Sequence, residues 1–355
     1  MRPVFIAGTG LACALGGDLP DCIAALLRGG VPLVAVTAAE GFDWPVFQLP
    51  RGDGDWATQA RAHVRRVAAE CGALATSRTA PMFVASSSLD IGEREQDASF
   101  PVDLQDFADV VAGWIDWRGP VYTVSTACTS SVNAMLAASD LIRHGEAANA
   151  LVLGIELPNR YTLAGFGAMQ LLSPDAARPF GAARNGLVLG EAVAASWLTS
   201  EAARWRVRGG ATVVDGRNPA GTEAGAVDAM CSQALSQAGL APSDVDLVKP
   251  QAAGSVTNDA IELDALRTVF GNALPPMVSF KAQIGHTLGA AGVAEIALLA
   301  RCIEARAWPA LGYALDPACE VALNQGAPAR LRYILFNTIG FGGGHTALVL
   351  EDCSR

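Results

Sequence analysis

The sequence has few charged residues and few aromatic residues. Charged side chains make up 17% and aromatic side chains 6% of its 355 residues, whereas 51% are hydrophobic and glycine and alanine are abundant. This composition excludes a disordered chain and favours helices packed closely on a sheet. The net charge of −10 and the lack of any long Lys/Arg run argue against nucleic-acid binding.

Long apolar runs and paired cysteines are also missing. No stretch approaches the roughly 18 uninterrupted apolar residues of a membrane span. The opening "MRPVFIAGTGLACALGG" fits a first strand and turn better than a signal peptide. The eight cysteines form no CxxC pair and no cluster, so we expect free thiols in a reducing cytoplasm and no metal site.

Short β-rich apolar runs alternate with alanine-rich amphipathic segments. This order predicts an α/β fold with a largely buried sheet. Strands are predicted at residues 3–8, 81–87, 121–126, 150–156, 210–216, 247–252, 277–282, 333–343 and 346–351, and helices at 21–29, 55–74, 130–146, 225–239 and 289–307.

Two segments repeat the same plan of strand, small-residue turn and alanine-rich helix. They are "VYTVSTACTSSVNAMLAASDLIRHGEA" and "MVSFKAQIGHTLGAAGVAEIALLARCIEA", with Cys128 and His286 at the matching turns. The repeat predicts an internal duplication, with one half at residues 1–197 and the other at 198–355. No low-complexity linker separates the halves, so we expect them to pack as one body.

Cys128 is the first candidate functional residue. It lies between a buried strand, "GPVYTV", and a long helix, inside the small-residue segment "STACTSS". A helix N-terminus favours thiolate over thiol and so lowers a cysteine pKa. The sequence therefore predicts an activated nucleophile that can take an acyl group from a thioester.

Five segments further along the chain form a recognisable set. In chain order they are "STACTSS", "RPFGAARNGLVLGE", "KPQAAGSVTND", "SFKAQIGHTLGAAGVAE" and "NTIGFGGGHTALVLE". They resemble the signatures of the β-ketoacyl-acyl-carrier-protein synthases, the condensing enzymes of the thiolase fold. The N-terminal "VFIAGTG" is also similar, so the resemblance covers almost the whole chain. It implies two duplicated α/β halves with buried mixed sheets in an α-β-α-β-α arrangement.

The resemblance implies a role for several residues. His286 becomes an active-site histidine facing the thioester or enolate, and Lys281 the active-site lysine that pairs with Glu295. Phe341 becomes the gate of the acyl pocket, and its backbone N–H forms the oxyanion hole with that of Cys128. A dinucleotide site at "GFGGG" is disfavoured because the loop leads into a strand.

The pattern breaks where the family has its first catalytic histidine. Gln251 stands there, and glutamine donates a hydrogen bond but shuttles no proton. Asn258 and Asp259 keep the family's ND pair as supporting residues. Of the remaining histidines, His345 is expected to support the active-site residues without contacting the substrate. His63 and His144 are expected on a helix surface and at a helix C-terminus.

Three functions stay open. One is an active condensing enzyme that transfers an acyl group to Cys128 and then performs a decarboxylative Claisen condensation with malonyl-carrier thioester, in fatty-acid or polyketide biosynthesis. The second is a chain-length-factor-like partner of an active ketosynthase, as in type II polyketide or aryl-polyene systems. The third is a non-decarboxylating acyltransferase.

The resemblance also implies partners. We expect an acyl carrier protein, whose phosphopantetheine delivers the acyl groups, so that no bound cofactor is needed. We expect a homodimer or a heterodimer with a second ketosynthase-like subunit. Because carrier proteins are acidic, a local basic patch is predicted, with "RAHVRR" and "RWRVR" as candidates.

Overall fold

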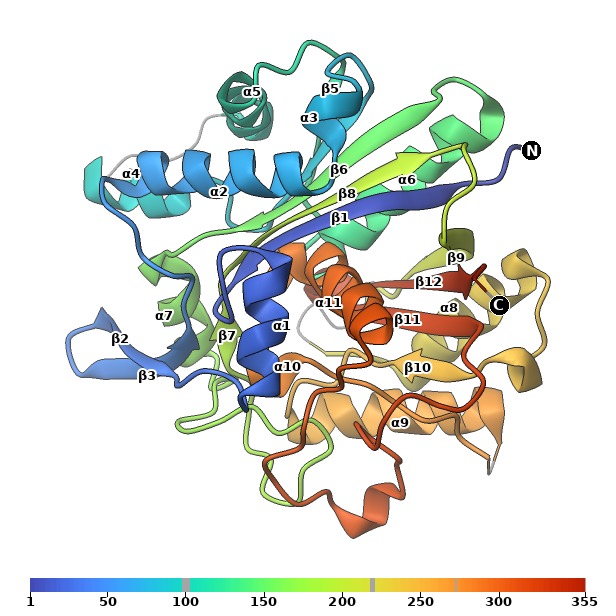
Figure 1. Cartoon of the computed structure of the whole chain (residues 1–355). Helices are drawn as coiled ribbons and strands as arrows, with labels where there is room; N and C mark the ends of the chain where they lie inside the picture. The colour runs from blue at the N-terminus through green and yellow to red at the C-terminus, as the bar shows by residue number, and fades with distance from the viewer. Residues whose placement is uncertain (98–102, 218–220, 272, 355) are drawn as a thin grey trace.

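Two blocks of β-strands, with helices between and outside them, make up the fold (Figure 1). The structure is a computed structural model and describes residues 1–97, 103–217, 221–271 and 273–354. Its strands are β1 (Phe5–Cys13), β2 (Val34–Ala39), β3 (Phe42–Phe47), β4 (Met82–Ala85), β5 (Val121–Val124), β6 (Asn149–Glu156), β7 (Leu189–Gly190), β8 (Ala192–Thr199), β9 (Trp205–Val214), β10 (Leu247–Lys249), β11 (Tyr333–Ile339) and β12 (Gly344–Asp352).

The helices alternate with these strands through most of the chain. They are α1 (Leu19–Leu27), α2 (Trp56–Glu70), α3 (Ala73–Thr76), α4 (Ile91–Asp97), α5 (Leu104–Trp114), α6 (Ser130–His144), α7 (Arg160–Ala168), α8 (Ala224–Ala238), α9 (Val256–Phe270), α10 (Lys281–Ile284) and α11 (Ala291–Ala305).

Nine of the strands form one hydrogen-bonded sheet, but its two blocks are joined only weakly. Its order is β10-β11-β12-β9-β1-β8-β6-β4-β5, and a small second sheet has the order β2-β3-β7. The link between β1 and β9 consists of two residue pairs, Phe5 with Arg206 and Ile6 with Trp205. Parallel pairs (β4 with β5 and β6, β10 with β11) mix with antiparallel ones. The blocks are therefore mixed sheets, as predicted.

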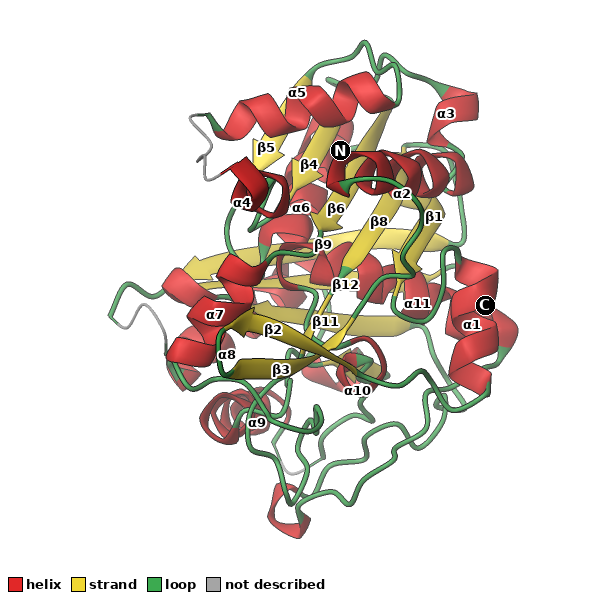
Figure 2. Ribbon diagram, turned by 90° about the vertical axis from the view of Figure 1, so that its left-hand side faces the viewer, coloured by secondary structure: helices red, strands yellow, loops and turns green. Residues whose placement is uncertain are grey.

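Helices α6 and α11 lie between the two blocks (Figures 1 and 2). Helix α11 has twelve of its fifteen residues buried, which is typical of a helix enclosed on all sides. It crosses α6 closely at Gly292, where an added Cβ would collide with Val132. Helices α2 and α5 cover one outer face, and α8 and α9 the other. The layers follow the predicted α-β-α-β-α order.

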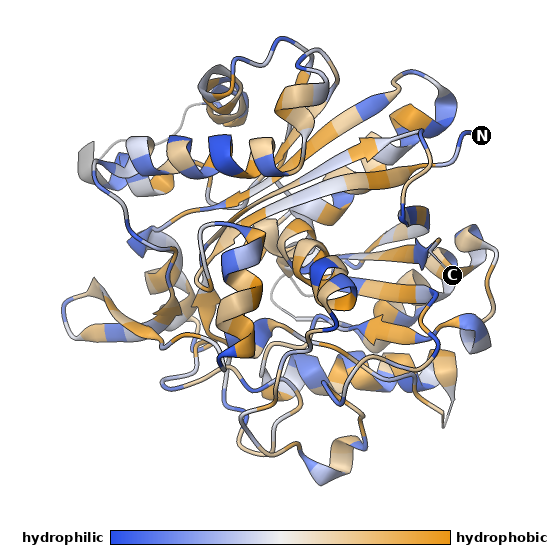
Figure 3. Ribbon diagram, in the orientation of Figure 1, coloured by the Kyte–Doolittle hydropathy of each residue, from blue (hydrophilic) through white to orange (hydrophobic). Residues whose placement is uncertain are grey.

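Hydrophobic residues concentrate on the strands and the central helices, whereas α2 and α9 alternate hydrophilic and hydrophobic turns (Figure 3). This pattern separates one core between the two blocks from two outer cores beneath α2 and α8. No helix among the described residues is both long and apolar enough to cross a membrane. The boundary between residues 197 and 198 stays a prediction.

One predicted strand, residues 277–282, is wrong. Only Met277 forms bridges, to Val248 and Leu323, and the chain then turns into the short helix α10. Strand β8 was missed because its eight residues are all buried and show no alternation. The hairpin of β2 and β3 and the helices α5, α7 and α9 were also missed.

Candidate active site

Cys128 lies in a tight turn between β5 and α6. The turn is held by its own hydroxyls: Ser130 donates to the carbonyl of Ala127 and accepts the N–H of Thr126, and Thr129 donates to the carbonyl of Thr126. Ala127 has φ of 52°, which is uncommon for a residue other than glycine. The turn thereby presents Cys128 at the start of the central helix, as predicted.

His286 lies directly against the Cys128 thiol. Its Nε2 atom is 2.9 Å from Sγ. The backbone of His286 is fixed next to β7, because it donates to the carbonyl of Val188 and accepts from the N–H of Gly190. Residues 158 positions apart are thus brought into hydrogen-bond contact from the matching turns of the repeated segments.

The thiol is not activated by a lowered pKa, contrary to the prediction. Burial raises the pKa of Cys128 to about 11, although the charge of Lys281 and the backbone N–H of Phe341 oppose the rise. Burial and the charges of Lys281 and Lys249 hold the pKa of His286 well below its usual range. The cost of removing the thiolate from water exceeds the helix effect. Near neutral pH the pair is a thiol beside a neutral imidazole.

The glycine-rich loop covers this pair. The N–H of Phe341 is directed at Sγ of Cys128, and the Phe341 ring stacks on Phe166 with centroids 5.5 Å apart and planes 15° apart. A small cavity of about 40 Å³ remains, lined by Cys128, His286, Gln251, Phe166 and Phe341, among others. The two stacked rings therefore close one side of the cavity.

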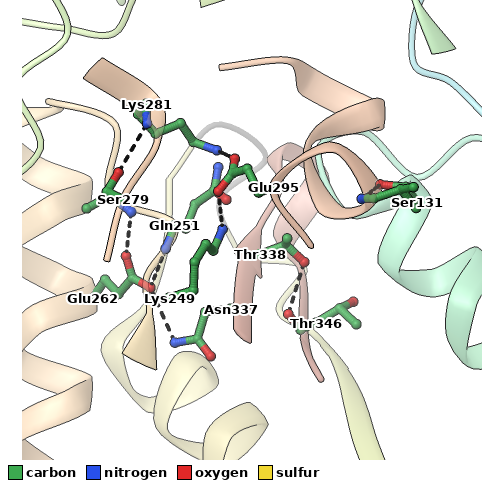
Figure 4. A network of polar contacts seen from close by, with 12 residues as sticks. Ser131, Lys249, Gln251, Glu262, Ser279, Lys281, Glu295, Asn337, Thr338 and Thr346 are labelled. Carbon is green, nitrogen blue, oxygen red and sulfur yellow. Dashed lines mark hydrogen bonds and ion pairs between the residues drawn. The ribbon is translucent and has the colours of Figure 1, made fainter. Parts of the chain in front are cut away.

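Lys281, Glu295 and Lys249 form a buried ion cluster (Figure 4), and the charges of its lysines act on His286. Lys281 binds Oε1 of Glu295, and the predicted pairing of these two residues is present in the structure. Sequence reasoning missed a third member, Lys249, whose Nζ is 2.7 Å from Oε2 of Glu295. All three side chains are completely buried. A lysine at the end of the apolar strand "LVK" was the available signal.

Gln251 occupies the place predicted for it beside the nucleophile. It lines the cavity with Cys128 and His286, and its backbone N–H donates to Glu262. Its buried side-chain Oε1 has no hydrogen-bond partner among the described residues. Glu262 also accepts the N–H of Ala252 and was missed in the sequence. The side-chain oxygen of Gln251 can therefore still accept a hydrogen bond from a ligand.

Asn258 and Asp259 lie beneath Gln251 on α9. Asn258 lines the cavity. Asp259 is buried and accepts the backbone N–H groups of Phe180, Ala253 and Gly254, which fixes the loop that follows Gln251. Burial raises the pKa of Asp259 to about 6. Its contacts are those of a residue that shapes the loop.

The other histidines lie away from the thiol. His345 is buried on β12 opposite Ile339, is not among the residues that line the cavity, and has no hydrogen-bond partner for either ring nitrogen among the described residues. His144 ends α6, where its Nδ1 is 2.8 Å from the Asp140 carbonyl oxygen. His63 is half-buried on α2 and lines a second cavity.

That second cavity, of about 400 Å³, begins where the apolar cluster around Cys128 ends. Leu163, Leu189 and Leu288 pack in the cluster with Cys128 and also line this cavity. Its more distant walls carry polar side chains, including Gln59 and Asn159. The small and the large cavity therefore lie on opposite sides of one apolar wall.

The two candidate basic segments differ. Arg61, Arg65 and Arg66 on α2 are exposed. The arginines of "RWRVR" are instead held in ion pairs: Arg204 with Asp352, and Arg206 and Arg208 with Glu351. Of the two segments, only the first carries arginines that no ion pair within the described ranges engages. In the described ranges no group of three or more His, Cys, Asp or Glu side chains is placed to hold a metal ion.

Comparison with known proteins identifies the family. The β-ketoacyl synthase N-terminal domain matches residues 93–203 and the C-terminal domain residues 205–312. The chain is 33% identical over 259 residues to nodulation protein E of Rhizobium leguminosarum bv. trifolii, covering 68% of this chain and 64% of that protein. It is also 33% identical over 278 residues to a Streptomyces halstedii protein named as a polyketide β-ketoacyl synthase, covering 70% and 64%.

Solved structures agree on the fold. A chain of the ketosynthase ApeO in complex with its chain length factor ApeC, from Xenorhabdus doucetiae, superposes with a TM-score of 0.86 at 24% identity, over 99% of this chain and 98% of that one. The matched part spans less than two thirds of the two curated relatives. With both domains matched in order and the thiolase-like fold present, the chain belongs to the β-ketoacyl synthase family.

Proposed function

We propose that the protein is an acyltransferase of the 3-oxoacyl-[acyl-carrier-protein] synthase type. The observation that carries the proposal is the contact of 2.9 Å between Cys128 Sγ and His286 Nε2, beneath the backbone N–H of Phe341. This arrangement places a nucleophile, a base and an oxyanion donor within reach of one thioester carbonyl.

In the first half-reaction, Cys128 attacks the carbonyl of an acyl thioester carried by phosphopantetheine. His286 takes the thiol proton as the sulfur–carbon bond forms, which removes the need for a preformed thiolate. The N–H groups of Cys128 and Phe341 bind the oxyanion. The carrier's sulfur–carbon bond then breaks, and the proton passes from His286 to the leaving thiolate.

In the second half-reaction, a malonyl thioester loses carbon dioxide and the resulting enolate attacks the acyl group on Cys128. A carbon–carbon bond forms, the bond to Sγ breaks, and one proton restores the thiol. We infer that the enolate oxygen accepts hydrogen bonds from His286, with its proton on Nε2, and from the side-chain N–H of Gln251. The ion pair of Lys281 and Glu295 supplies the nearby buried charge.

The acyl chain has a place in the cavity of about 400 Å³ behind Leu163 and Leu288. The exposed arginines of α2 suit an acidic acyl carrier protein, whose phosphopantetheine would deliver both substrates without a resident cofactor. Seven buried and one exposed free cysteine suit a reducing cytoplasm. We include a dimer, with an identical or a related ketosynthase-like subunit, in the proposal.

The test uses the whole protein and acyl-pantetheine thioesters of graded length. Intact-mass and peptide analysis should show one acyl group on Cys128, and none on the C128A variant. Addition of malonyl-pantetheine should release carbon dioxide and a β-ketoacyl product. Absence of acylation with every chain length and with acyl carrier protein would refute the proposal.

A second function, a chain-length-factor-like partner subunit, is favoured by Gln251 alone. A glutamine cannot replace the proton transfer of a histidine, so the decarboxylation step would fall to the other subunit. In that case the isolated chain should dimerise poorly, and the cognate synthase should form a 1:1 complex with higher condensing activity. A stable homodimer that condenses at full rate would reject this function.

A further inference from the structure

The two lysines of the chain lie in one buried place. The sequence has 25 Lys and Arg residues in total, and Lys249 and Lys281 are the only lysines among them. Both side chains are completely buried. A lysine is normally a solvent-exposed residue, and this protein uses arginine at every other such position. Both lysines of this chain therefore lie in the interior, where their charges act on His286.

Lys249 is held there by three elements. Strand β10 ends at Lys249, which pairs with Phe336 of β11, and its Nζ lies 4.1 Å from the centre of the Phe336 ring. The same Nζ is 2.7 Å from Oε2 of Glu295 on α11, while Lys281 holds Oε1. Figure 4 shows the two lysines reaching Glu295 from different sides. The geometry fixes both ammonium groups.

The cluster carries more positive than negative charge. Two ammonium groups share the carboxylate of Glu295, and together they lower its pKa although burial opposes this. The other acid that faces Lys249 is Glu262, whose pKa burial raises to about 7. Burial lowers the pKa of Lys249 itself to about 8. Near neutral pH the surplus charge therefore depends on Lys249.

We propose that Lys249 is a positioning residue of the active site. By taking one oxygen of Glu295 it leaves a surplus positive charge, shared with Lys281, behind His286 and Cys128. This charge favours negative charge on Sγ and on the thioester or enolate oxygen, next to the neutral Gln251. The effect on the enolate rests on the proposed function; the effect on the thiol does not.

The first test measures the pH dependence of Cys128 alkylation by iodoacetamide in the whole protein. Below about pH 8, where Lys249 carries its charge, alkylation in Lys249→Met should be roughly tenfold slower than in the unmodified protein, and the two profiles should converge at higher pH. Lys249→Arg keeps the charge and should stay within about threefold of the unmodified protein. Because alkylation needs no acyl substrate, the result is readable even if the condensing function fails.

A purely structural lysine would change the melting temperature and leave the pH profile in place. A folded Lys249→Met protein with an unchanged profile therefore overturns the proposal. So does equal slowing of alkylation near neutral pH in Lys249→Arg and Lys249→Met when both are folded, because charge would then be irrelevant.

A second test needs no methionine variant, in case that protein fails to fold. Lysine labelled at Cε should give two NMR resonances, assigned with K249R or K281R. Alkylating Cys128 with iodoacetate leaves a carboxylate beside Sγ, and by reciprocity the pKa of Lys249 should rise, whereas the neutral group left by iodoacetamide serves as the control. Movement of the Lys249 resonance supports the proposal. Unmoved titration curves, or movement of Lys281 alone, overturn it.

Discussion

The turn at Cys128 and the loop at Gln251 meet in one cavity but differ in what they retain. The Cys128 side has a nucleophile, a base at 2.9 Å and a backbone N–H, which is what acyl transfer needs. The Gln251 side offers an amide, whose oxygen has no hydrogen-bond partner in the part of the chain that the structure describes, where the family has a proton-transferring histidine. Acyl transfer and decarboxylation can therefore fail separately, and each can be measured without the other.

The largest effect should come from the Cys128 side. Replacing Cys128 with alanine removes the bond-forming atom and should abolish acylation, measured by intact mass. Replacing His286 with alanine removes the base and one enolate donor, and should slow acylation about 100- to 10,000-fold. Leu235→Ala, a buried change on α8 that lines neither cavity, serves as a folding-matched control that should acylate normally. Acylation of the C128A protein at another residue would contradict the assignment.

A substitution at Gln251 should raise a rate, whereas those at Cys128 and His286 lower one. Gln251→His restores a second imidazole and should speed decarboxylation of malonyl thioester at least tenfold, while acylation changes little. One oxyanion donor is worth about 100- to 1000-fold elsewhere, so a tenfold gain requires only partial recovery. The rates are followed by carbon dioxide release and by intact mass.

The control for this prediction is His345→Ala. His345 lies outside the cavity, so decarboxylation should be unchanged in that variant. Collapse of condensation with intact acylation would instead assign the missing imidazole's role to His345. A slower Q251H protein would show that the site is built around the amide.

The sequence was sufficient for what depends on local pattern. The strand, turn and helix around Cys128 and the helix that carries Glu295 were predicted because their apolar spacing is regular. Sequence patterns gave the wrong secondary structure where contacts between distant segments determine it. The segment around Met277 has strand-like composition, but the chain must turn there to bury Lys281.

Electrostatics was the second failure. A helix N-terminus is visible in a sequence, whereas the loss of water around a thiol is not, and the second outweighed the first at Cys128. Lys249 was overlooked for a related reason. Its partner Glu295 lies 46 residues away, on a helix whose position relative to β10 no local pattern gives.

The pH dependence of alkylation sharpens the comparison further. Because the pKa of Cys128 is raised to about 11, the thiolate is a minor species at pH 7, and alkylation should accelerate roughly tenfold for each pH unit from 7 to 10. Exposed Cys353 should react first near neutral pH, with Cys128 ahead of buried Cys71, whose pKa is raised to about 12. Peptide mapping after brief treatment checks the order. Labelling of Cys128 before Cys353 at pH 7, with a flat profile, would restore the activated thiolate.

The smallest effect on the rates should come from the surface of α2, where the acyl carrier protein is proposed to dock in both half-reactions. Reversing the charge of Arg61 and Arg65 on α2 removes exposed cations that no ion pair in the described part of the chain engages. The KM for acyl carrier protein should rise a few-fold to tenfold, and less so at high salt, because exposed charges are screened. Acyl-pantetheine lacks the acidic protein, so its kinetics should stay unchanged and report an intact site.

The arginines of β9 provide the matched control for this prediction. Arg206 is already paired with Glu351, and its reversal should alter stability more than carrier affinity. Equal losses with acyl-pantetheine and with the carrier protein would place the docking surface elsewhere.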